Sequence, residues 1–557
     1  MVALLEVEAA DILSSPMKIV LAEKVSPATL AVFRQEPSWQ VVTADQIQNG
    51  LEAELADADA LVVRSAVQVT AKLLESAPKL RVIGRAGVGV DNIDADAATH
   101  RGVVVMNTPG ANAVAVAELT LGLMITMARQ IPRANTGMHA GKWDKKNLQG
   151  TELRGKTLGI VGLGRIGIEV ARRARSFGMD LIAFDPFVAP VIARENGVSL
   201  VSIDQIFSNS DYLTLHVGLT PQTEGMINRH SIGIMKPGIR IVNCARGELI
   251  NDADLLEGLQ SGKVGGAALD VFTVEPLKDS PFYNEDKVIL TPHLGGSTDE
   301  AQEAIGIQLA QQVSAYLKSG VVQNAVNVPS LTREEYVEVA PFIDLAERLG
   351  TFLAHATPGH LENIEIAYAG RLAASKTDLI RNALLAGVLR DSEQVNHINS
   401  AAVAQERGIR IQEDRKEFAS GGAGSVLKLV LHSAEGDARA SATVLHGNSP
   451  RLLSLDGIDI EAPLTGTLLV IRNHDVPGVI GRIGTVLGEC GINVANFALG
   501  RSVRSQSVPQ GQAMAVVQID APSASKAQDA VNALRKVEAI ATVRLVELSK
   551  AEASPEA

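Results

Sequence analysis

Short apolar runs rich in β-branched residues alternate with helix-like stretches through the first half of the chain. Four such runs come first, and they are Lys18–Ala22, Ala60–Val63, Arg81–Ile83 and Val103–Met106. A second series follows at Thr157–Val161, Asp180–Asp185, Tyr212–His216, Ile239–Asn243, Gly265–Leu269 and Val288–Leu290. Buried strands that alternate with helices are typical of βαβ units around a parallel sheet. The pattern therefore predicts two successive α/β blocks.

The pattern changes near residue 298. A helix is predicted between the N-cap candidates Ser297 and Thr298 and the glycine Gly320, because apolar residues recur there at helical spacing. Residues 331–463 have weaker patterning and no motif that carries chemistry. Pro463–Gly466 is interpreted as a linker, and a β-α-β-β-α-β order follows it. We expect an α+β block and then a small ferredoxin-like domain.

Composition limits the classes of function open to this chain. It has 557 residues, of which 46% are hydrophobic and 20% charged, as in a folded chain of about three or four domains. A net charge of −12 without a basic block disfavours nucleic-acid and membrane partners, so an anionic ligand needs a local basic pocket. Cys244 and Cys490 allow no disulfide framework or cysteine metal cluster, and no metal is expected. The leader, residues 1–16, resembles no targeting segment, so we expect a cytoplasmic location.

A glycine-rich segment lies where a strand meets a helix. The predicted strand Thr157–Val161 runs directly into Gly162-Leu163-Gly164-Arg165-Ile166-Gly167. In this GxGxxG context Gly162 allows a tight turn, Gly164 lets the backbone approach a pyrophosphate, and Gly167 lets the helix pack on the strand. Asp185, which ends the next strand, can accept hydrogen bonds from a ribose and would repel a 2′-phosphate. The motif predicts a dinucleotide site that prefers NAD over NADP.

Three further polar residues follow strands of the same block, and they are Arg246, Glu275 and His293. Ligands on open α/β sheets bind at these carboxyl ends. The imidazole can take a hydroxyl proton, and a carboxylate beside it would orient the ring and support its charged form. A guanidinium can hold a substrate carboxylate through two hydrogen bonds. Each residue alone could be structural, but the three together indicate hydride transfer to or from a 2-hydroxy acid.

At these segments the chain resembles the D-isomer-specific 2-hydroxyacid dehydrogenases. The likeness covers residues 17–330 and implies a Rossmann-type NAD domain, 113–298, inserted in a flavodoxin-like substrate domain formed by 17–112 and 299–330. It also implies that Asp270 holds the nicotinamide carboxamide. The remaining NAD contacts that the resemblance and the motif imply are Gly162, Gly164, Arg165, Ile166, Gly167, Asp185, Cys244, Ala245, Gly295 and Gly296.

Within that family the chain is similar to the long-type phosphoglycerate dehydrogenases at Val63-Arg64-Ser65, Gly84–Asn92 and Asn107–Asn112. This resemblance implies that Val88 and Gly89 offer backbone N–H groups to the substrate carboxylate and that Asn112 approaches the substrate. The candidates for binding the substrate phosphate are Arg64, Arg85 and Lys145. Some relatives have arginine in place of Lys145. Residues 331–463 resemble the intervening domain of these enzymes.

The final block, residues 466–548, resembles the ACT regulatory domain at Arg472–Ile480 and Gly491–Asn493. That resemblance implies contacts from Asn473, Asp475 and Asn493 to an amino-acid effector such as L-serine, at an interface between two such domains. An aspartate suits the ammonium group of the effector, and an asparagine suits either end. A block that only joins subunits is the alternative, and the resemblance favours a homotetramer.

Together these features predict NAD-dependent oxidation of 3-phospho-D-glycerate to 3-phosphooxypyruvate, the first step of L-serine biosynthesis. In this hypothesis His293 takes the hydroxyl proton, Glu275 supports His293, and Arg246 orients the substrate carboxylate. One alternative is another D-2-hydroxyacid dehydrogenase, acting on glycerate or hydroxypyruvate, but Arg64 and Arg85 favour a phosphorylated substrate. The other is a non-catalytic NAD-sensing binding protein such as a corepressor, which the ACT-like block argues against.

Overall fold

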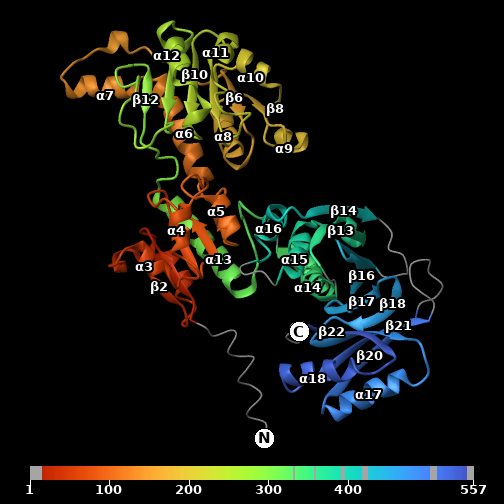
Figure 1. Cartoon of the computed structure of the whole chain (residues 1–557). Coiled ribbons are helices and arrows are strands. Elements are labelled where there is room, and N and C mark those ends of the chain that lie inside the picture. The colour runs from red at the N-terminus through yellow and green to blue at the C-terminus, as the bar shows by residue number, and fades with distance from the viewer. Residues whose placement is uncertain are drawn as a thin grey trace.

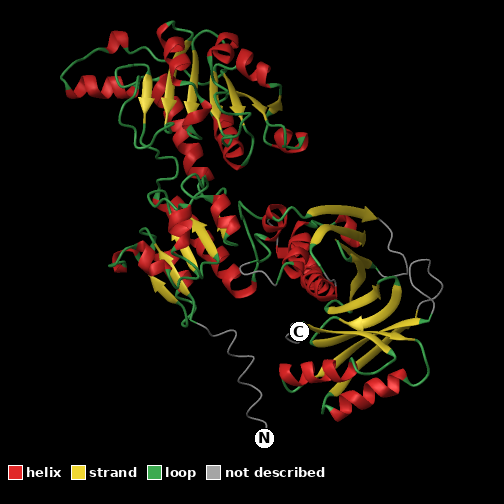
Figure 2. Ribbon diagram, in the orientation of Figure 1, coloured by secondary structure: helices red, strands yellow, loops and turns green. Residues whose placement is uncertain are grey.

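Four sheets organise the chain, two in its first half and two in its second (Figure 1, Figure 2). The structure, a computed structural model, describes residues 16–329, 333–356, 359–390, 395–416, 424–501 and 511–548. Almost all of the leader therefore lies outside the described residues. Within these ranges no single helix is long and apolar enough to cross a membrane. Two consecutive helices, Ala113–Ala128 and Ile131–His139, are long and apolar enough only when they are taken together, and the pair is bent by 65°.

The first sheet has five parallel strands in the order β2-β1-β3-β4-β5, which is the order of a flavodoxin-like fold. Its strands are β1 (Lys18–Leu21), β2 (Gln40–Val42), β3 (Ala60–Val63), β4 (Val82–Arg85) and β5 (Val104–Met106). Its helices are α2 (Pro27–Phe33), η1 (Ala44–Gln46), α3 (Leu51–Leu55), α4 (Ala71–Glu75) and α5 (Ala95–His100). The sequence pattern does not predict β2, because this edge strand has three residues and buries only Val42 fully.

A helix from much later in the chain covers this first sheet. α13 (Asp299–Ser319) begins at the N-cap Thr298 and ends at Gly320 in the left-handed conformation, as the sequence predicts. Leu309 and Val313 pack so closely on β4 that a Cβ placed on Gly84 would lie 3.1 Å from each side chain. The first sheet therefore completes its core with residues that follow the second sheet in the sequence.

The second sheet has seven parallel strands in the order β12-β11-β10-β9-β6-β7-β8. Its strands are β6 (Thr157–Val161), β7 (Asp180–Phe184), β8 (Ser199–Leu200), β9 (Tyr212–Leu215), β10 (Ile239–Asn243), β11 (Val264–Leu269) and β12 (Val288–Leu290). Its helices are α6 (Ala113–Ala128), α7 (Ile131–His139), η2 (Lys145–Asn147), α8 (Arg165–Ser176), α9 (Pro190–Glu195), α10 (Ile203–Asn209), α11 (Arg229–Ile234), η3 (Gly247–Leu249) and α12 (Asp252–Gln260). The strand order reverses between β6 and β9, and dinucleotides bind at such a switch point in Rossmann-type folds.

The third and fourth sheets form the second half of the chain. The third has the order β14-β13-β15-β16-β17-β18, and the fourth has the antiparallel order β20-β21-β19-β22. The strands are β13 (Leu361–Gly370), β14 (Arg410–Lys416), β15 (Ser425–Ser433), β16 (Gly436–Leu445), β17 (Ser449–Leu455), β18 (Ile458–Pro463), β19 (Thr467–His474), β20 (Asn493–Arg501), β21 (Gln512–Asp520) and β22 (Ile540–Glu547). The helices are α14 (Arg333–Ala356), η4 (Arg371–Ala374), α15 (Asp378–Val388), α16 (Ser400–Glu406), α17 (Val479–Glu489) and α18 (Ala524–Leu534). α17 and α18 lie on one face of the fourth sheet, as expected for a ferredoxin-like βαββαβ block (Figure 1).

The third and fourth sheets share one hydrophobic core. Leu452 and Ile460 on one side and Leu468 and Val516 on the other belong to the same buried cluster. The edges also meet, since a Cβ placed on Gly500 of β20 would lie 2.5 Å from the carbonyl oxygen of Asp459 in β18. The segment after Pro463 thus connects two sheets that pack together, and it is a short turn from β18 to β19.

Candidate active site

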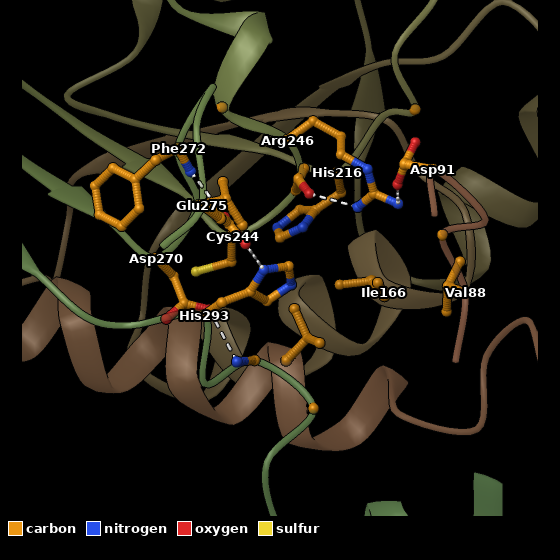
Figure 3. A pocket seen from close by; sticks show the side chains of 18 of the residues that line it. Val88, Asp91, Ile166, His216, Cys244, Arg246, Asp270, Phe272, Glu275 and His293 are labelled. Atoms are coloured by element: carbon orange, nitrogen blue, oxygen red, sulfur yellow. Dashed lines mark hydrogen bonds and ion pairs between the residues drawn. The ribbon is translucent and has the colours of Figure 1, made fainter. Parts of the chain in front are cut away.

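Two adjoining cavities of about 370 and 480 Å³ lie between the first and second sheets. Their lining residues come from the carboxyl ends of strands β4, β10, β11 and β12 and from the start of α6 (Figure 3). Residues that line both cavities are Arg85, Asp91, Asn112, Glu275, His293 and Gly296. The structure therefore brings the three predicted catalytic residues to one place, because Arg246 lines the smaller cavity with Glu275 and His293.

The glycine-rich loop at the end of β6 has the backbone geometry that its sequence predicts. Gly162 adopts a φ of 92°, and a Cβ on it would lie 2.4 Å from the carbonyl oxygen of His216. A Cβ on Gly167 would lie 2.1 Å from the carbonyl oxygen of Gly162, so α8 can approach β6 only with glycine there. A Cβ on Gly164 would meet nothing within 4 Å in the described chain. The loop therefore leaves an open approach to the N-terminus of α8, where backbone N–H groups favour a phosphate.

Asp185 and Arg165 both have partners within the chain. Asp185 accepts hydrogen bonds from the backbone N–H of Leu163 at 2.8 Å and from those of Phe187 and Val188 at 2.9 and 3.1 Å. Its carboxylate is therefore fixed beside the glycine-rich loop. The guanidinium of Arg165 donates to the carbonyl oxygen of Pro109, in the segment that leads from the first sheet to α6. This predicted NAD contact thus also joins the nucleotide loop to the first block.

His293 and Glu275 form the predicted pair. Nδ1 of His293 lies 2.7 Å from Oε2 of Glu275, and Oε1 of the same carboxylate accepts a hydrogen bond from the Phe272 N–H at 3.0 Å (Figure 3). Glu275 is therefore anchored from both oxygens. Nε2 of His293 has no hydrogen-bond partner among the described residues, and the ring lines both cavities. This geometry leaves one ring nitrogen available for a substrate proton.

Asp270 positions the loop that carries His293. Its fully buried carboxylate accepts hydrogen bonds from the Thr291 hydroxyl at 2.6 Å and from the N–H groups of Leu294 and Gly295, each at 2.8 Å. The backbone of His293 adopts a φ of 53° and donates to the Asp270 carbonyl oxygen at 2.9 Å. A left-handed backbone is uncommon for histidine and persists where its surroundings hold it. Asp270 lines the smaller cavity and also fixes this conformation.

Arg246 is held at the end of β10. Buried Asn243 donates through Nδ2 to the carbonyl oxygen of Arg246 at 2.7 Å, and Arg246 donates to the carbonyl oxygen of Ala245 at 2.7 Å. Nη2 of Arg246 lies 3.3 Å from Oδ2 of Asp91, which belongs to the loop after β4 (Figure 3). The guanidinium therefore faces the first block across the cavity.

The first block supplies two more arginines and a backbone donor pair. Arg64 and Arg85 line the larger cavity, while Val88 and Gly89 line the smaller one. Asn107 fixes the loop that holds Val88 by donating to its carbonyl oxygen at 2.6 Å. Burial, and then the proximity of Arg246, lower the pKa of Arg85, and its buried Nε lacks a partner within the described chain. A bound anion would satisfy this group.

Lys145 does not join this site within one chain. It lies in η2, in the segment between α7 and β6, and it lines neither cavity. The predicted phosphate contact of Lys145 is therefore not supported by the geometry of a single chain. Local sequence identifies a basic residue in a loop but carries no information on where that loop projects.

His216 lines the smaller cavity, although the sequence reasoning does not single it out. Its Nε2 lies 2.9 Å from the Thr214 hydroxyl, and its buried Nδ1 has no partner in the described part of the chain. Burial lowers the pKa of His216 to about 3. His216 directly follows β9, and the other site residues of this sheet also follow strands. This position is the sequence signal that could identify it. Beside it, burial raises the pKa of Cys244 to about 12, so both groups are neutral near pH 7.

The three predicted effector contacts do not meet within one chain. Asn473 pairs with Ala513 at the start of β21, whereas Asn493 pairs with Asp520 at its end. Seven residues of strand separate these positions by about 23 Å. Asp475 lies near Asn473 and forms an ion pair with Arg501 at 3.4 Å. Buried Asn473 has an Oδ1 without a partner in the described residues.

Three family models match this chain. The D-isomer specific 2-hydroxyacid dehydrogenase NAD binding domain matches residues 121–295. The D-3-phosphoglycerate dehydrogenase intervening domain matches residues 338–456, and the ACT domain matches residues 467–538. The three matches fall on the segments that form the second, third and fourth sheets.

Relatives extend over nearly the whole chain. The D-3-phosphoglycerate dehydrogenase of Methanocaldococcus jannaschii is 39% identical over 95% of this chain and 100% of its own length. That of Bacillus subtilis is 38% identical over 95% of this chain and 99% of its own. Among solved structures, D-lactate dehydrogenase from Aquifex aeolicus, complexed with NAD and lactic acid, superimposes with a TM-score of 0.50 and 28% identity over 56% of this chain and 100% of its own.

Proposed function

This chain belongs to the D-3-phosphoglycerate dehydrogenase family, and we propose that its active site oxidises 3-phospho-D-glycerate to 3-phosphooxypyruvate in the first step of L-serine biosynthesis. The family makes it an NAD-dependent oxidoreductase. The observation that carries the choice of substrate is the placement of Arg64 and Arg85 across the cavities from the Glu275–His293 pair.

The residues divide the chemistry of the proposed reaction between them. Bound NAD supplies the acceptor for the hydride that leaves C2 of the substrate. His293 takes the hydroxyl proton through its free Nε2, so that the C2 oxygen becomes a carbonyl. Glu275, on the opposite ring nitrogen, keeps the imidazole in place and stabilises its positive charge once the proton has moved. Arg246 holds the substrate carboxylate, together with the N–H groups of Val88 and Gly89.

A phosphorylated substrate fits the first block better than glycerate does. Arg64 and Arg85 both face the larger cavity, and the Nε of Arg85 is a buried donor without a partner in the described residues. A buried charged donor is costly unless an anion pairs with it. Glycerate would engage the carboxylate-binding groups and leave these two arginines unpaired.

Steady-state kinetics with two substrates test this proposal. Arg64→Ala should raise the KM for 3-phospho-D-glycerate by at least about tenfold and change the kinetics of D-glycerate little, because only the former carries the phosphate. Arg34→Ala, an exposed arginine of the same block, is the matched control. Equal losses on both substrates would show that Arg64 does not bind the phosphate. No turnover of either substrate with NAD would favour the NAD-sensing alternative.

We also propose that L-serine binds at the fourth sheet, between two copies of the chain. Asn473 and Asp475 would come from one copy and Asn493 from the other, because the opposite ends of β21 separate them within one chain. Such a site requires at least a dimer, and a homotetramer in the cytoplasm is the assembly that we propose. The support for this proposal is the match to the ACT domain and the unpaired Oδ1 of Asn473.

A further inference from the structure

A third cavity, which we call the junction cavity, lies where the first sheet meets the helices of the third. Its volume of about 720 Å³ falls within the range of about 300–1,000 Å³ that small-molecule sites occupy. One wall comes from the turns that precede β4 and β5, and another from the end of α13. The opposite wall comes from α14, α15 and residues 395–398. The active site is at the other end of β4 and β5, so this cavity is separate from it.

Positive side chains dominate the walls of the junction cavity. Lys79, Arg81 and Arg101 belong to the first block, and Arg390 belongs to the end of α15. Among the residues that the structure describes, none of these four groups has a carboxylate within ion-pair distance. Glu347, the acidic side chain of the lining, is already engaged by His397, with 3.0 Å between Oε2 and Nε2. The chain has a net charge of −12, yet four cations surround this cavity and Glu347 is the one carboxylate among its described lining residues, so the local excess of positive charge indicates a site for a negative ligand.

Two tyrosines and several aliphatic residues complete the cavity. The ring of Tyr316 lies 5.8 Å from the guanidinium carbon of Arg81, which restrains that arginine against the wall. The hydroxyls of Tyr316 and Tyr336 form no hydrogen bond with the described residues, and both tyrosines line the cavity. Ile343 and Ile398 add apolar surface. Guanidinium groups, hydroxyl donors and an apolar wall suit an organic anion with more than one charged group.

We propose that the junction cavity binds a small organic polyanion, with phosphate or carboxylate groups held by Arg81 and Arg101 on one side and by Arg390 on the other. Such a ligand would connect the first block to the third sheet. Direct contacts already join them there, since Asn396 donates to the carbonyl oxygen of Gly102 at 3.0 Å and His100 pairs with Glu406 at 3.0 Å (Figure 1).

The position of the site gives it a route to the active site. Arg81 immediately precedes β4, and Arg85 at the other end of that strand lines the substrate cavity. Four residues of strand span about 13 Å. A ligand that holds Arg81 therefore fixes one end of the strand that presents Arg85.

Calorimetric titration of the full chain tests the proposal with two probes, inorganic pyrophosphate and citrate. We expect the Arg81→Gln/Arg390→Gln double variant to bind at least one probe about tenfold or more weakly than the unmutated chain. Arg410→Gln, an exposed arginine of β14, should bind the same probe as the unmutated chain does. Arg64→Gln, which removes only binding at the active site, should keep the binding that the double variant loses. Loss of pyrophosphate binding alone indicates a phosphorylated ligand, and loss of citrate binding alone indicates a polycarboxylate.

A second variant separates loss of charge from loss of fold. Arg81→Lys/Arg390→Lys keeps both charges and should retain most of the affinity that the glutamine variant loses. The proposal is overturned if neither probe binds at millimolar concentration. It is also overturned if Arg81→Gln/Arg390→Gln binds both probes normally, or if Arg64→Gln abolishes all binding.

Discussion

Arg246 and Asp91 form an ion pair across the cavity between the first and second blocks, with 3.3 Å between Nη2 and Oδ2. Arg246 is also the residue that we expect to hold the substrate carboxylate. Asp91 is 72% exposed on its side chain and reaches toward the arginine from the opposite block. The carboxylate of Asp91 therefore pairs with the same guanidinium group that we expect the substrate carboxylate to bind.

Asp91→Asn should lower the KM for 3-phospho-D-glycerate by up to about fivefold, because an exposed ion pair contributes about 0.2–1 kcal/mol and here competes with the substrate. The turnover number should change little, since Asp91 has no part in the proton transfer. Steady-state kinetics measure both constants, and Asp96→Asn, another exposed acid of the first block, serves as the control. A higher KM in Asp91→Asn would instead mean that Asp91 holds Arg246 in its working position.

His293→Ala should reduce turnover by roughly 10²–10⁴-fold, the usual size of a general acid–base contribution. Glu275→Gln should reduce it less, because the imidazole remains but loses the negative charge beside Nδ1. Turnover of both variants is measured with saturating NAD and substrate. His230→Ala, which changes an exposed histidine of the same block, should be unaffected, and near-normal turnover in His293→Ala would disprove the assignment.

Asp185→Ala should narrow the preference for NAD over NADP, because the carboxylate that would repel a 2′-phosphate is gone. Three backbone N–H groups also lose their acceptor, so the variant should use NAD itself less well. The ratio of kcat/KM for the two cofactors separates these effects. If the unmutated chain already used both cofactors equally, Asp185 would have no role in the choice.

His216 should make the fold sensitive to acid. Its pKa falls from 6.5 to about 3 on burial, so the unfolded chain takes up a proton more readily than the folded chain between these values. The neutral ring thus contributes stability that is fully present above about pH 6.5 and is lost progressively as the pH falls toward 3. Thermal denaturation of His216→Gln should show a smaller loss of midpoint temperature on acidification than the unmutated chain. An identical pH dependence of the two midpoints would contradict this prediction.

Asp475→Asn should weaken inhibition by L-serine and leave basal turnover almost intact, if the fourth sheet binds the amino acid through this carboxylate. The coupling between such sites is typically about 1–3 kcal/mol. Turnover of the full chain is measured in increasing L-serine, because the fourth sheet shares its core with the third and its removal would expose Leu452 and Ile460. Asp529→Asn is the control, and equal inhibition of the two variants would exclude a role for Asp475.

Features that depend on short stretches of sequence are predicted well. The GxGxxG loop combines steric demands at Gly162 and Gly167 that only glycine meets, so its sequence and its geometry correspond closely. The catalytic residues follow predicted strands of one parallel sheet, and the carboxyl ends of such strands meet at one edge. For this reason the Glu275–His293 pair could be expected although 18 positions separate the two residues.

Features that depend on long-range packing are predicted poorly. The turn at residues 463–466 has the composition of a linker, and only the structure shows that both of its neighbours contribute to one core. Asn473 and Asn493 are close in the sequence, but the antiparallel pairing of β21 places them at opposite ends of that strand. The junction cavity has walls from six separate segments, and no single segment carries its signature.

The return of α13 to the first sheet imposes an order on folding during synthesis. Strands β1 to β5 leave the ribosome first, but Leu309 and Val313, which cover them, emerge roughly 200 residues later, a delay of about 10–40 s at 5–20 residues per second. A nascent chain in this interval can already complete the second sheet, while Ile19 and Val82 have no cover from α13. The substrate side of the enzyme is therefore the last part of the first half to mature, and a nascent chain stalled in this interval presents a ready target for chaperones.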